Sequence, residues 1–330
     1  MKAKKLLALL LAAILACFAL VSCGEAEDNE LSAVSIGVIS GPTGVGAVSL
    51  MEKSANTETE GKYNFTLAAN QDDARTKFLN GELDIVAMPT NLAATLYAKG
   101  EDIVVLTVNT YGVLYILDAT GEINSIADLS GKTITATGQG SNPEYILKYI
   151  LEENSVENVT IEFMDDASAV SAAMVSGEVK IAMLPQPVAT TTVIQAKQAG
   201  ITINTALYMT EEWNKVSDDS SLMMGCMVTS KAFIEAHPEE VNMFLKEYNA
   251  SIEAVLADME TAASLCEKHS IIPKAAVAKQ AIPKCNICFA TGEEMKTELS
   301  GYLTVLYEAN AKSIGGSLPA DDFYYMGYEG

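Results

Sequence analysis

Short apolar runs along this chain are separated by polar and glycine-bearing stretches, and the same order of runs occurs twice. Residues 80–94 read NGELDIVAMPTNLAA, and residues 176–190 read SGEVKIAMLPQPVAT. Each segment has Gly-Glu, an apolar run, a proline and then small residues, which predicts a strand, a turn and the start of a helix. Because the two segments align without gaps, we interpret them as copies of one structural unit.

The correspondence extends toward the N-terminal side of both copies. The stretches YNFTLAANQDDARTKFL and VTIEFMDDASAVSAAMV each predict a strand, an acidic helix cap and a helix, with caps at Asp72 and Asp73 and at Asp165 and Asp166. Farther upstream, VSIGVISGPTG and KTITATGQGSNPEY each predict a strand that runs into a glycine-rich turn. Strands that alternate with helices imply parallel pairing through crossovers, so the repeat predicts two similar α/β domains.

The last third of the chain differs, because it is mainly helical from Lys231 onward. Pro238 followed by Glu239 predicts a helix start, and another helix is expected from about Glu293 to Ala311. The aromatic end DDFYYMGY is expected to pack on the body of the protein. Apolar residues at helical spacing predict a buried stripe made of Val241, Phe244, Leu245, Tyr248, Ile252, Val255, Leu256 and Met259.

Four predicted turns at the carboxyl ends of repeated strands are the candidate functional region. They span Ser40–Gly44, Met88–Asn91, Gln139–Asn142 and Leu184–Pro187. Ligands of open α/β sheets bind at this end of the strands. The turns carry hydroxyls, amides and free backbone N–H groups, without a catalytic base, a partnered nucleophile or a metal cluster, which predicts binding rather than catalysis.

The first of these turns has the glycine spacing of a phosphate-binding loop but not its chemistry. In SGPTGVGAVS, Gly41 and Gly46 have the right separation. Such a loop needs a lysine and a serine or threonine after the second glycine, where this chain has Ala47 and Val48. We therefore reject nucleotide hydrolysis and keep a turn whose backbone N–H groups favour an anion or a polar group.

The N-terminus has the pattern of a secretory signal peptide. Three lysines precede the apolar run Leu6–Ala19, which is too short to span a membrane comfortably. The residues LVSC that follow resemble a bacterial lipobox, and this resemblance implies that Cys23 is acylated after cleavage. Residues 1–22 are then the signal peptide and residues 23–32 a lipidated tether, which holds the mature chain at the outer face of the cytoplasmic membrane.

The composition of the chain limits which partners it can bind. The net charge of the 330 residues is −22, and removal of residues 1–22 takes away three lysines and no acid, which shifts the charge from −22 to −25. Such a chain is expected to avoid nucleic acid and anionic lipid surfaces. Its length and its 49% hydrophobic content suit two domains with large cores.

Cysteine and histidine do not make a convincing metal site. The spacing of Cys285 and Cys288 would suit redox chemistry or half a zinc site. A zinc site needs two further ligands, and the only histidines are His237 and His269, which lie outside the turns. We expect no metal, no cofactor and unbridged or locally bridged thiols at the remaining cysteines, which are Cys226, Cys266, Cys285 and Cys288.

The lipobox, the repeated lobes and the helical C-terminal return together resemble the substrate-binding lipoproteins of ABC importers. The group that the chain resembles most binds nitrate, sulfonates, taurine and thiamine-pyrimidine precursors. The phrases LNGELDIVAMPTNLAA, INSIADLSGKTITATGQGSNPEYIL and VSGEVKIAMLPQPVATTTV carry this resemblance, which covers nearly all of the mature chain.

The resemblance implies a type II periplasmic-binding fold, in which two similar three-layer α/β lobes are joined by a two-segment hinge. Residues 33–112 and 216–330 form the first lobe with the C-terminal helices, and residues 113–215 form the second. The two crossovers map to about Thr107–Leu117 and Ala206–Met227.

The resemblance also assigns the ligand to the turns. Tyr111 and Tyr115 on the first crossover are expected either to stack on a flat ligand or to pack in the hinge. Relatives that bind amino acids usually clamp a carboxylate with an arginine, but the one arginine here, Arg75, lies within a helix. The ligand is then a sulfonate-like anion or a small neutral heteroaromatic, and the negative charge of the chain favours the second. The matching turns supply Ser40, Thr43, Gly44, Thr90, Asn91, Gln139, Ser141, Asn142 and Gln186.

Three functions stay open at this point. The first is a monomeric, non-enzymatic receptor that delivers a small molecule to a membrane permease driven by an ATPase. The second is an enzyme on the same fold that acts on a thiamine-pyrimidine or menaquinone precursor, which would need a histidine or carboxylate site that the turns lack. The third is a sensor or adhesin that binds a partner protein.

Overall fold

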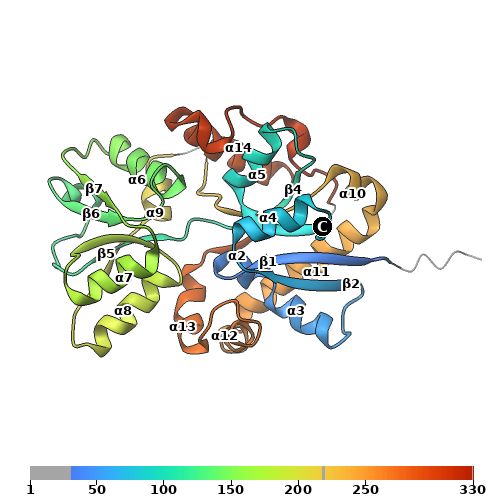
Figure 1. The fold of residues 1–330 in the computed structure, drawn as a ribbon, viewed down its shortest axis with the longest axis horizontal. Coiled ribbons are helices and arrows are strands. Elements are labelled where there is room, and N and C mark those ends of the chain that lie inside the picture. Colours follow the sequence, from blue (N-terminus) through green and yellow to red (C-terminus); the bar gives the residue numbers. More distant parts are fainter. Residues whose placement is uncertain (1–30, 218–219, 329) are drawn as a thin grey trace, which may run out of the picture. The chain divides into compact units, whose positions relative to one another are not determined.

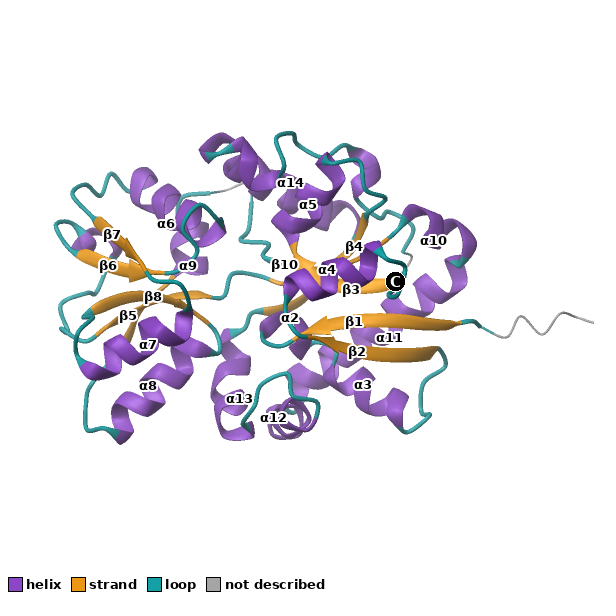
Figure 2. Cartoon of the chain, viewed as in Figure 1, coloured by secondary structure: helices purple, strands orange, loops and turns teal. Residues whose placement is uncertain are grey.

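The computed structural model describes residues 31–217, 220–328 and 330 (Figures 1 and 2). Residues 33–330 form one compact unit, which contains all the described helices and strands. The predicted signal peptide, Cys23 and the tether up to residue 30 lie outside the described residues. None of the described helices is long and apolar enough to cross a membrane.

Residues 33–330 form two sheets, each built on three parallel strands. These strands are β1 (Ala33–Ile39), β2 (Lys62–Ala68), β3 (Ile85–Pro89), β6 (Thr133–Ala136), β7 (Thr160–Phe163) and β8 (Ile181–Pro185). In the first sheet β1 lies between β2 and β3, and in the second β6 lies between β7 and β8. The matching orders confirm the predicted repeat.

Antiparallel strands complete both sheets. They are β4 (Val104–Thr110), β5 (Leu114–Asp118), β9 (Asn204–Tyr208), β10 (Gly225–Thr229) and β11 (Ile287–Ala290). The full orders are β11-β4-β10-β3-β1-β2 and β7-β6-β8-β5-β9. The chain crosses from β4 to β5 and returns after β9 to β10. The predicted parallel pairing of the repeated strands is confirmed. The crossover strands β5 and β10, for which no orientation was predicted, pair antiparallel with β8 and β3, because each follows a strand of the other sheet and has no helical crossover in its own sheet.

Helices cover both sheets (Figure 2). We call the first sheet and its helices the first lobe, and the second sheet and its helices the second lobe; the exact predicted boundaries stay predictions. The first lobe contains α2 (Pro42–Val45), α3 (Val48–Ala55), α4 (Gln71–Leu79), α5 (Thr90–Ala98), α10 (Lys231–Ala236), α11 (Pro238–Ala257), α12 (Met259–Lys268), α13 (Ala275–Ala281) and α14 (Gly292–Ala309). The second contains α6 (Asn142–Glu153), α7 (Ala167–Ser176), α8 (Val188–Gln198) and α9 (Met209–Asn214).

Local sequence sets the starts of the repeated helices. The side chain of Asn70 caps α4 by accepting hydrogen bonds from the backbone N–H groups of Asp72 and Asp73 at 2.9 and 3.0 Å. The prediction that these two aspartates form the cap is therefore wrong, because they lie in the first turn of the helix. Asp166 caps α7 as predicted, accepting from the N–H of Ala169 at 2.8 Å.

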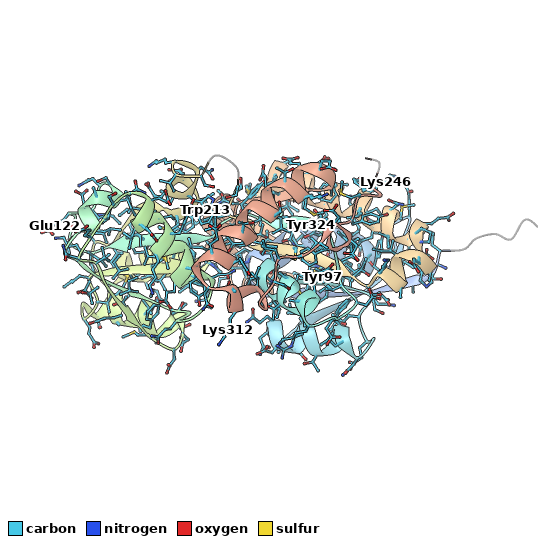
Figure 3. All side chains as sticks on the ribbon, turned by 90° about the horizontal axis from the view of Figure 1, so that it is seen from above. Tyr97, Glu122, Trp213, Lys246, Lys312 and Tyr324 are labelled. Carbon is cyan, nitrogen blue, oxygen red and sulfur yellow. The ribbon has the colours of Figure 1, made fainter. Side chains whose placement is uncertain are left out.

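The C-terminal region is helical and docks as expected. The predicted stripe of α11 is buried from Val241 to Val255, but Leu256 is 45% exposed, because it lies one position beyond the buried face. The end of the chain packs through the buried Phe323 and Tyr324, and the labelled side chain of Tyr324 marks this segment in Figure 3. The N–H of Tyr325 donates to the carbonyl of Val105 at 2.9 Å.

One apolar cluster runs through both lobes. It includes Val86 and Val105 of the first sheet, Ile116 and Ile134 of the second, and Tyr302 of α14. Two further clusters lie within single lobes, one under α11 and one between the second sheet and α7 and α8. The shared cluster means that the two lobes are packed together along one side as well as joined by two crossovers.

Candidate functional site

The carboxyl ends of β1, β3 and β6 lie around a cavity of about 330 Å³, which we call the central cavity. It gathers three of the four predicted turns and residues next to both crossovers. Its lining residues are Pro42, Thr43, Gln71, Pro89, Asn91, Thr110, Val113, Ser141, Asn142, Pro143, Met224 and Gly225.

Four of the predicted ligand-binding residues line this cavity, namely Thr43, Asn91, Ser141 and Asn142. A buried side chain fixes the turn at Thr43, because Asn109 donates its Nδ2 to the Thr43 carbonyl at 3.1 Å. The Ser141 hydroxyl donates to the carbonyl of Gly138 at 2.7 Å, which tightens the turn before α6. The structure therefore brings turns of both repeats to one cavity.

The other predicted residues do not line the central cavity. Several hydroxyl and amide groups are used in bonds within the protein: Thr90 donates to the Met223 carbonyl at 2.5 Å, Ser40 to the Ser270 carbonyl at 3.2 Å, and Gln186 accepts from Thr190 at 2.8 Å. Gly44 is buried in α2, and Gln139 is exposed at the turn before α6.

The two crossover tyrosines occupy different surroundings. Tyr115 is buried, its hydroxyl donates to the carbonyl of Lys284 at 2.6 Å, and its ring packs edge-on against Tyr208 at 4.9 Å. This placement favours hinge packing for Tyr115. Tyr111 is half-buried, and burial, followed by the nearby Cys288 and Glu298, raises its pKa above the usual value, so the hydroxyl stays protonated.

Sequence reasoning missed lining residues that lie outside the four turns. Gln71 begins α4 directly after β2, a strand end that was not counted among the four turns. Gly225 begins β10, and a Cβ atom there would lie 2.4 Å from the Cγ2 of Thr43, so only glycine fits. The glycine in the run MMGCMV was the visible signal for this close approach.

The central cavity is electrically neutral along its described lining. None of the lining residues carries a titratable side chain, and Arg75 pairs with Asp72 on α4 at 3.2 Å. The polar side chains of this lining carry only hydroxyls and amides. Asn142 stands at the start of α6 and is 6% exposed.

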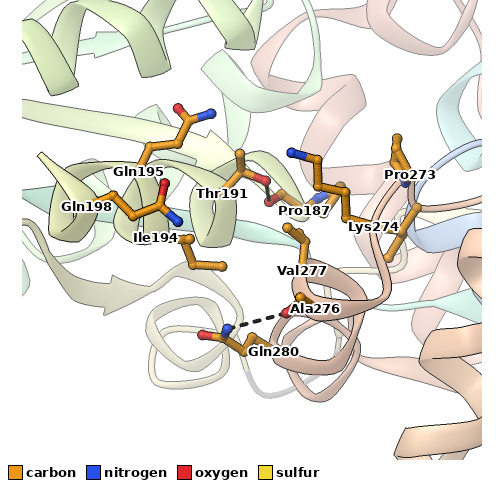
Figure 4. Close-up of a pocket in the computed structure, with 11 residues that line it drawn as sticks. Pro187, Thr191, Ile194, Gln195, Gln198, Pro273, Lys274, Ala276, Val277 and Gln280 are labelled. Atoms are coloured by element: carbon orange, nitrogen blue, oxygen red, sulfur yellow. Dashed lines mark hydrogen bonds between the residues drawn. The ribbon is translucent and has the colours of Figure 1, made fainter.

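A second cavity, of about 520 Å³, lies between α8 and α13, and we call it the α8–α13 cavity (Figure 4). Of the predicted turns only Pro187 reaches it. Gln195 and Gln198 on α8 face Lys274, Val277 and Gln280 across it (Figure 4). Although the α8–α13 cavity is the larger of the two, we take the central cavity as the candidate site, because its described lining joins turns of both repeats.

A family model described as "NMT1/THI5 like" matches residues 66–262, which include the first crossover, the whole second lobe and three of the four turns. The chain belongs to the NMT1/THI5-like family. No curated protein is detectably similar to it in sequence.

Solved structures share the fold of this NMT1/THI5-like chain. An ABC transporter protein from Parabacteroides distasonis is 18% identical with a TM-score of 0.75, over 91% of this chain and 100% of the other. The periplasmic aliphatic sulphonate binding protein SsuA from Escherichia coli is 16% identical with a TM-score of 0.68, over 90% and 94%. A ligand-binding component of an ABC-type import system from Staphylococcus aureus, solved with zinc bound, is 14% identical with a TM-score of 0.65, over 89% and 97%.

The described cysteines of this NMT1/THI5-like chain are all unbridged. Burial raises the pKa of each thiol, to about 12 for Cys266, so the thiols are protonated and unreactive at neutral pH. Within residues 31–217 and 220–328, no group of histidine, cysteine and acidic side chains is arranged to hold a metal ion.

Proposed function

We propose that this protein is an extracytoplasmic solute-binding receptor of an ABC importer, which captures a small organic molecule in the central cavity. The observation that carries the proposal is the lining of that cavity by strand ends from both sheets and by both crossovers. A molecule bound there contacts both lobes. Family membership and the ABC-import proteins among the solved neighbours support the same assignment.

A ligand that touches both lobes stabilises the arrangement in which they lie closest, so binding shifts the protein toward a closed form. The closed form is then recognised by a membrane permease, which an ATPase drives from the cytoplasm. Acylation of Cys23 would hold the receptor at the outer face of the membrane, as a monomer. Of the predicted ligand contacts, we place most weight on Thr43, Asn91, Ser141 and Asn142, because all four line one cavity.

The chemistry of the cavity favours a receptor over an enzyme. General acid–base or nucleophilic catalysis needs a titratable or nucleophilic group close to the ligand, and the described lining has none beyond hydroxyls. The histidines lie elsewhere: His269 contacts Glu52 at 3.0 Å, and the ring of His237 packs on Phe233 at 4.8 Å. A product formed on incubation with a retained molecule would overturn this assignment.

The test is to identify by mass spectrometry the small molecules that the purified protein retains, and to measure their affinity. The double variant Asn91→Ala/Ser141→Ala should weaken retention and reduce ligand-induced thermal stabilisation. The matched control Gln198→Ala, which changes the α8–α13 cavity, should behave as the wild type. Equal protection of the double variant and the wild type would place the site outside the central cavity.

A further inference from the structure

The second lobe reaches the central cavity through one short turn. In the described lining, this lobe contributes the run Ser141–Pro143 at the start of α6, and Val113 lies next to the first crossover. The remaining lining residues belong to the first lobe or to the return crossover. The position of this turn therefore decides whether a molecule in the cavity contacts both lobes.

The turn that leads into α6 contains two glycines in the left-handed conformation. Gly138 has a φ of 78° and Gly140 a φ of 73°. Glycine adopts this conformation readily, but it also loses more conformational freedom than other residues when it is fixed. The N–H and the hydroxyl of Ser141 both donate to the carbonyl of Gly138, at 3.0 and 2.7 Å. These bonds close the turn, but they leave the N–H of Gly140 to be held from outside it.

The side chain of Glu144 supplies that contact. Its Oε2 accepts a hydrogen bond from the N–H of Gly140 at 2.6 Å, and its Oε1 pairs with Lys148 one helical turn farther along α6. The bond from Gly140 first, and then the bond from Lys148, lower the pKa of this carboxyl below its usual value, so it is ionised at neutral pH. Glu144 is 9% exposed and lies outside the described lining of the central cavity, so its two oxygens serve the protein and not a ligand.

The spacing of Ser141 and Glu144 is that of a capping box, but the bonds are different. In a capping box the glutamate accepts from the N–H of the cap residue, and the cap side chain accepts from the N–H of the glutamate. Here the glutamate reaches one residue farther back, to Gly140, and the Ser141 hydroxyl donates to Gly138. The pair therefore holds the glycine turn rather than the end of the helix.

We propose that Glu144 is a positioning residue for ligand binding, which holds Gly140, and with it the run Ser141–Pro143, in the place that a bound molecule contacts. A turn that is fixed beforehand does not have to be ordered during binding, which raises affinity without a new contact. The inference rests on the proposed receptor function and adds to it a residue that supports the site from behind.

Two substitutions separate the reach of the side chain from its charge. Glu144→Gln keeps an acceptor oxygen at the same distance and loses the charge, whereas Glu144→Asp keeps the charge but is one methylene shorter, so it does not reach Gly140. We expect Glu144→Asp and Glu144→Ala to weaken binding by at least about fivefold, and Glu144→Gln by less than about twofold. Glu152→Ala, at the other end of α6, is the matched control and should bind as the wild type.

Four probes cover the two ligand classes that the sequence leaves open. Methanesulfonate and benzenesulfonate are sulfonate anions, and benzamide and 4-aminopyrimidine are small neutral rings. Their affinities are measured by calorimetry at pH 7 on full-length variants that urea unfolding shows to be folded. Hydrogen exchange followed by NMR reports on the turn itself: the N–H of Gly140 should exchange at least about tenfold faster in Glu144→Asp than in the wild type, and at a similar rate in Glu144→Gln.

The outcomes separate the inference from the receptor function. Unchanged affinity or unchanged exchange at Gly140 in Glu144→Asp overturns the role of Glu144 and leaves the receptor standing. Weaker binding by Glu144→Gln than by Glu144→Asp overturns it as well, because the charge and not the contact would then matter. If Glu144→Ala does not fold, the other two variants decide alone. A folded wild type that binds none of the four probes counts against both the inference and the receptor.

Discussion

The two lobes meet along two sides that differ in how well they are filled. On one side, α6 and α9 pack against α14: Trp213 and Tyr302 are both completely buried with ring centres 5.7 Å apart, and the ring of Tyr149 lies tilted against Trp213 at 4.6 Å. In Figure 3, Trp213 lies where the second lobe meets α14. On the other side, α8 and α13 leave the α8–α13 cavity of about 520 Å³ between them.

This difference indicates where the lobes can separate. Opening the packed side would expose large aromatic surfaces and break the Asn142–Tyr302 bond. On the hollow side the hydroxyl of Tyr115 bonds to the carbonyl of Lys284, but the α8–α13 cavity leaves less packed surface to expose there. We therefore expect the packed side to act as a pivot and the hollow side to widen and narrow. Asn142 lines the central cavity and also bonds to Tyr302 on the packed side. A ligand in this cavity can therefore shift the equilibrium between the open and closed arrangements of the lobes.

Removal of the largest side chain on the packed side should cause the largest loss of stability. Trp213→Ala leaves a void among buried aromatic rings and also removes the indole N–H that donates to the Ser220 carbonyl at 3.0 Å. We expect a loss of about 3–5 kcal/mol in the free energy of unfolding, measured by urea denaturation. Gln198→Ala on the hollow side should change it by less than about 0.5 kcal/mol. Similar losses for both variants would abolish the contrast.

The next largest effect should be a fall in the free energy of unfolding at alkaline pH. Burial raises the pKa of Tyr302 far above the value near 10 of an unfolded tyrosine. The stabilising effect of this neutral hydroxyl is complete below pH 10 and is lost above it, because the unfolded chain releases a proton that the folded chain keeps. The unfolding free energy should fall by about 1.4 kcal/mol per pH unit for this group. Tyr302→Phe should flatten the slope by that amount, whereas Tyr307→Phe, at an exposed position of α14, should not.

Much of the fold was predictable because its signals are local. The repeated runs ending in AMP and MLP contain their own strands, turns and helix starts, and the structure pairs β2-β1-β3 and β7-β6-β8 alike. The strands β5 and β10 were not predicted to be antiparallel, because their partners β8 and β3 are set by chain crossings over long distances. No periodicity within a strand contains that information.

The candidate site was predictable as a set of turns but not as a set of contacts. Glycines and prolines marked the turns, and three of the four line the central cavity. Whether a polar side chain is free to bind a ligand depends on hydrogen-bond partners far along the chain. The hydroxyl of Thr90 donates to the carbonyl of Met223, and the amide of Asn142 donates to the hydroxyl of Tyr302, which is 160 residues away. The sequence offered no signal for either pairing.

A single hydrogen bond on the packed side should have a smaller effect. The Nδ2 of Asn310 donates to the hydroxyl of Tyr145 at 2.6 Å and so joins the end of α14 to α6. Tyr145→Phe removes the acceptor and keeps the ring, so we expect a loss of about 1 kcal/mol in unfolding free energy. A double-mutant cycle with Asn310→Ala measures the coupling of the pair. No coupling would mean that the aromatic rings alone hold this side.

The smallest effect on stability, and the sharpest test of the pivot, comes from filling the hollow side. Ala276 is exposed at the wall of the α8–α13 cavity, so Ala276→Trp has room and should change the unfolding free energy by less than about 0.5 kcal/mol. If ligand binding narrows this side, the added ring should block the closure. It should weaken binding of a molecule that the purified protein retains several-fold and prevent the decrease in radius of gyration that X-ray scattering detects on binding. Ala276→Ser is the control. Unchanged affinity together with an unchanged decrease would show that the lobes move elsewhere, and the packed side would lose its role as pivot.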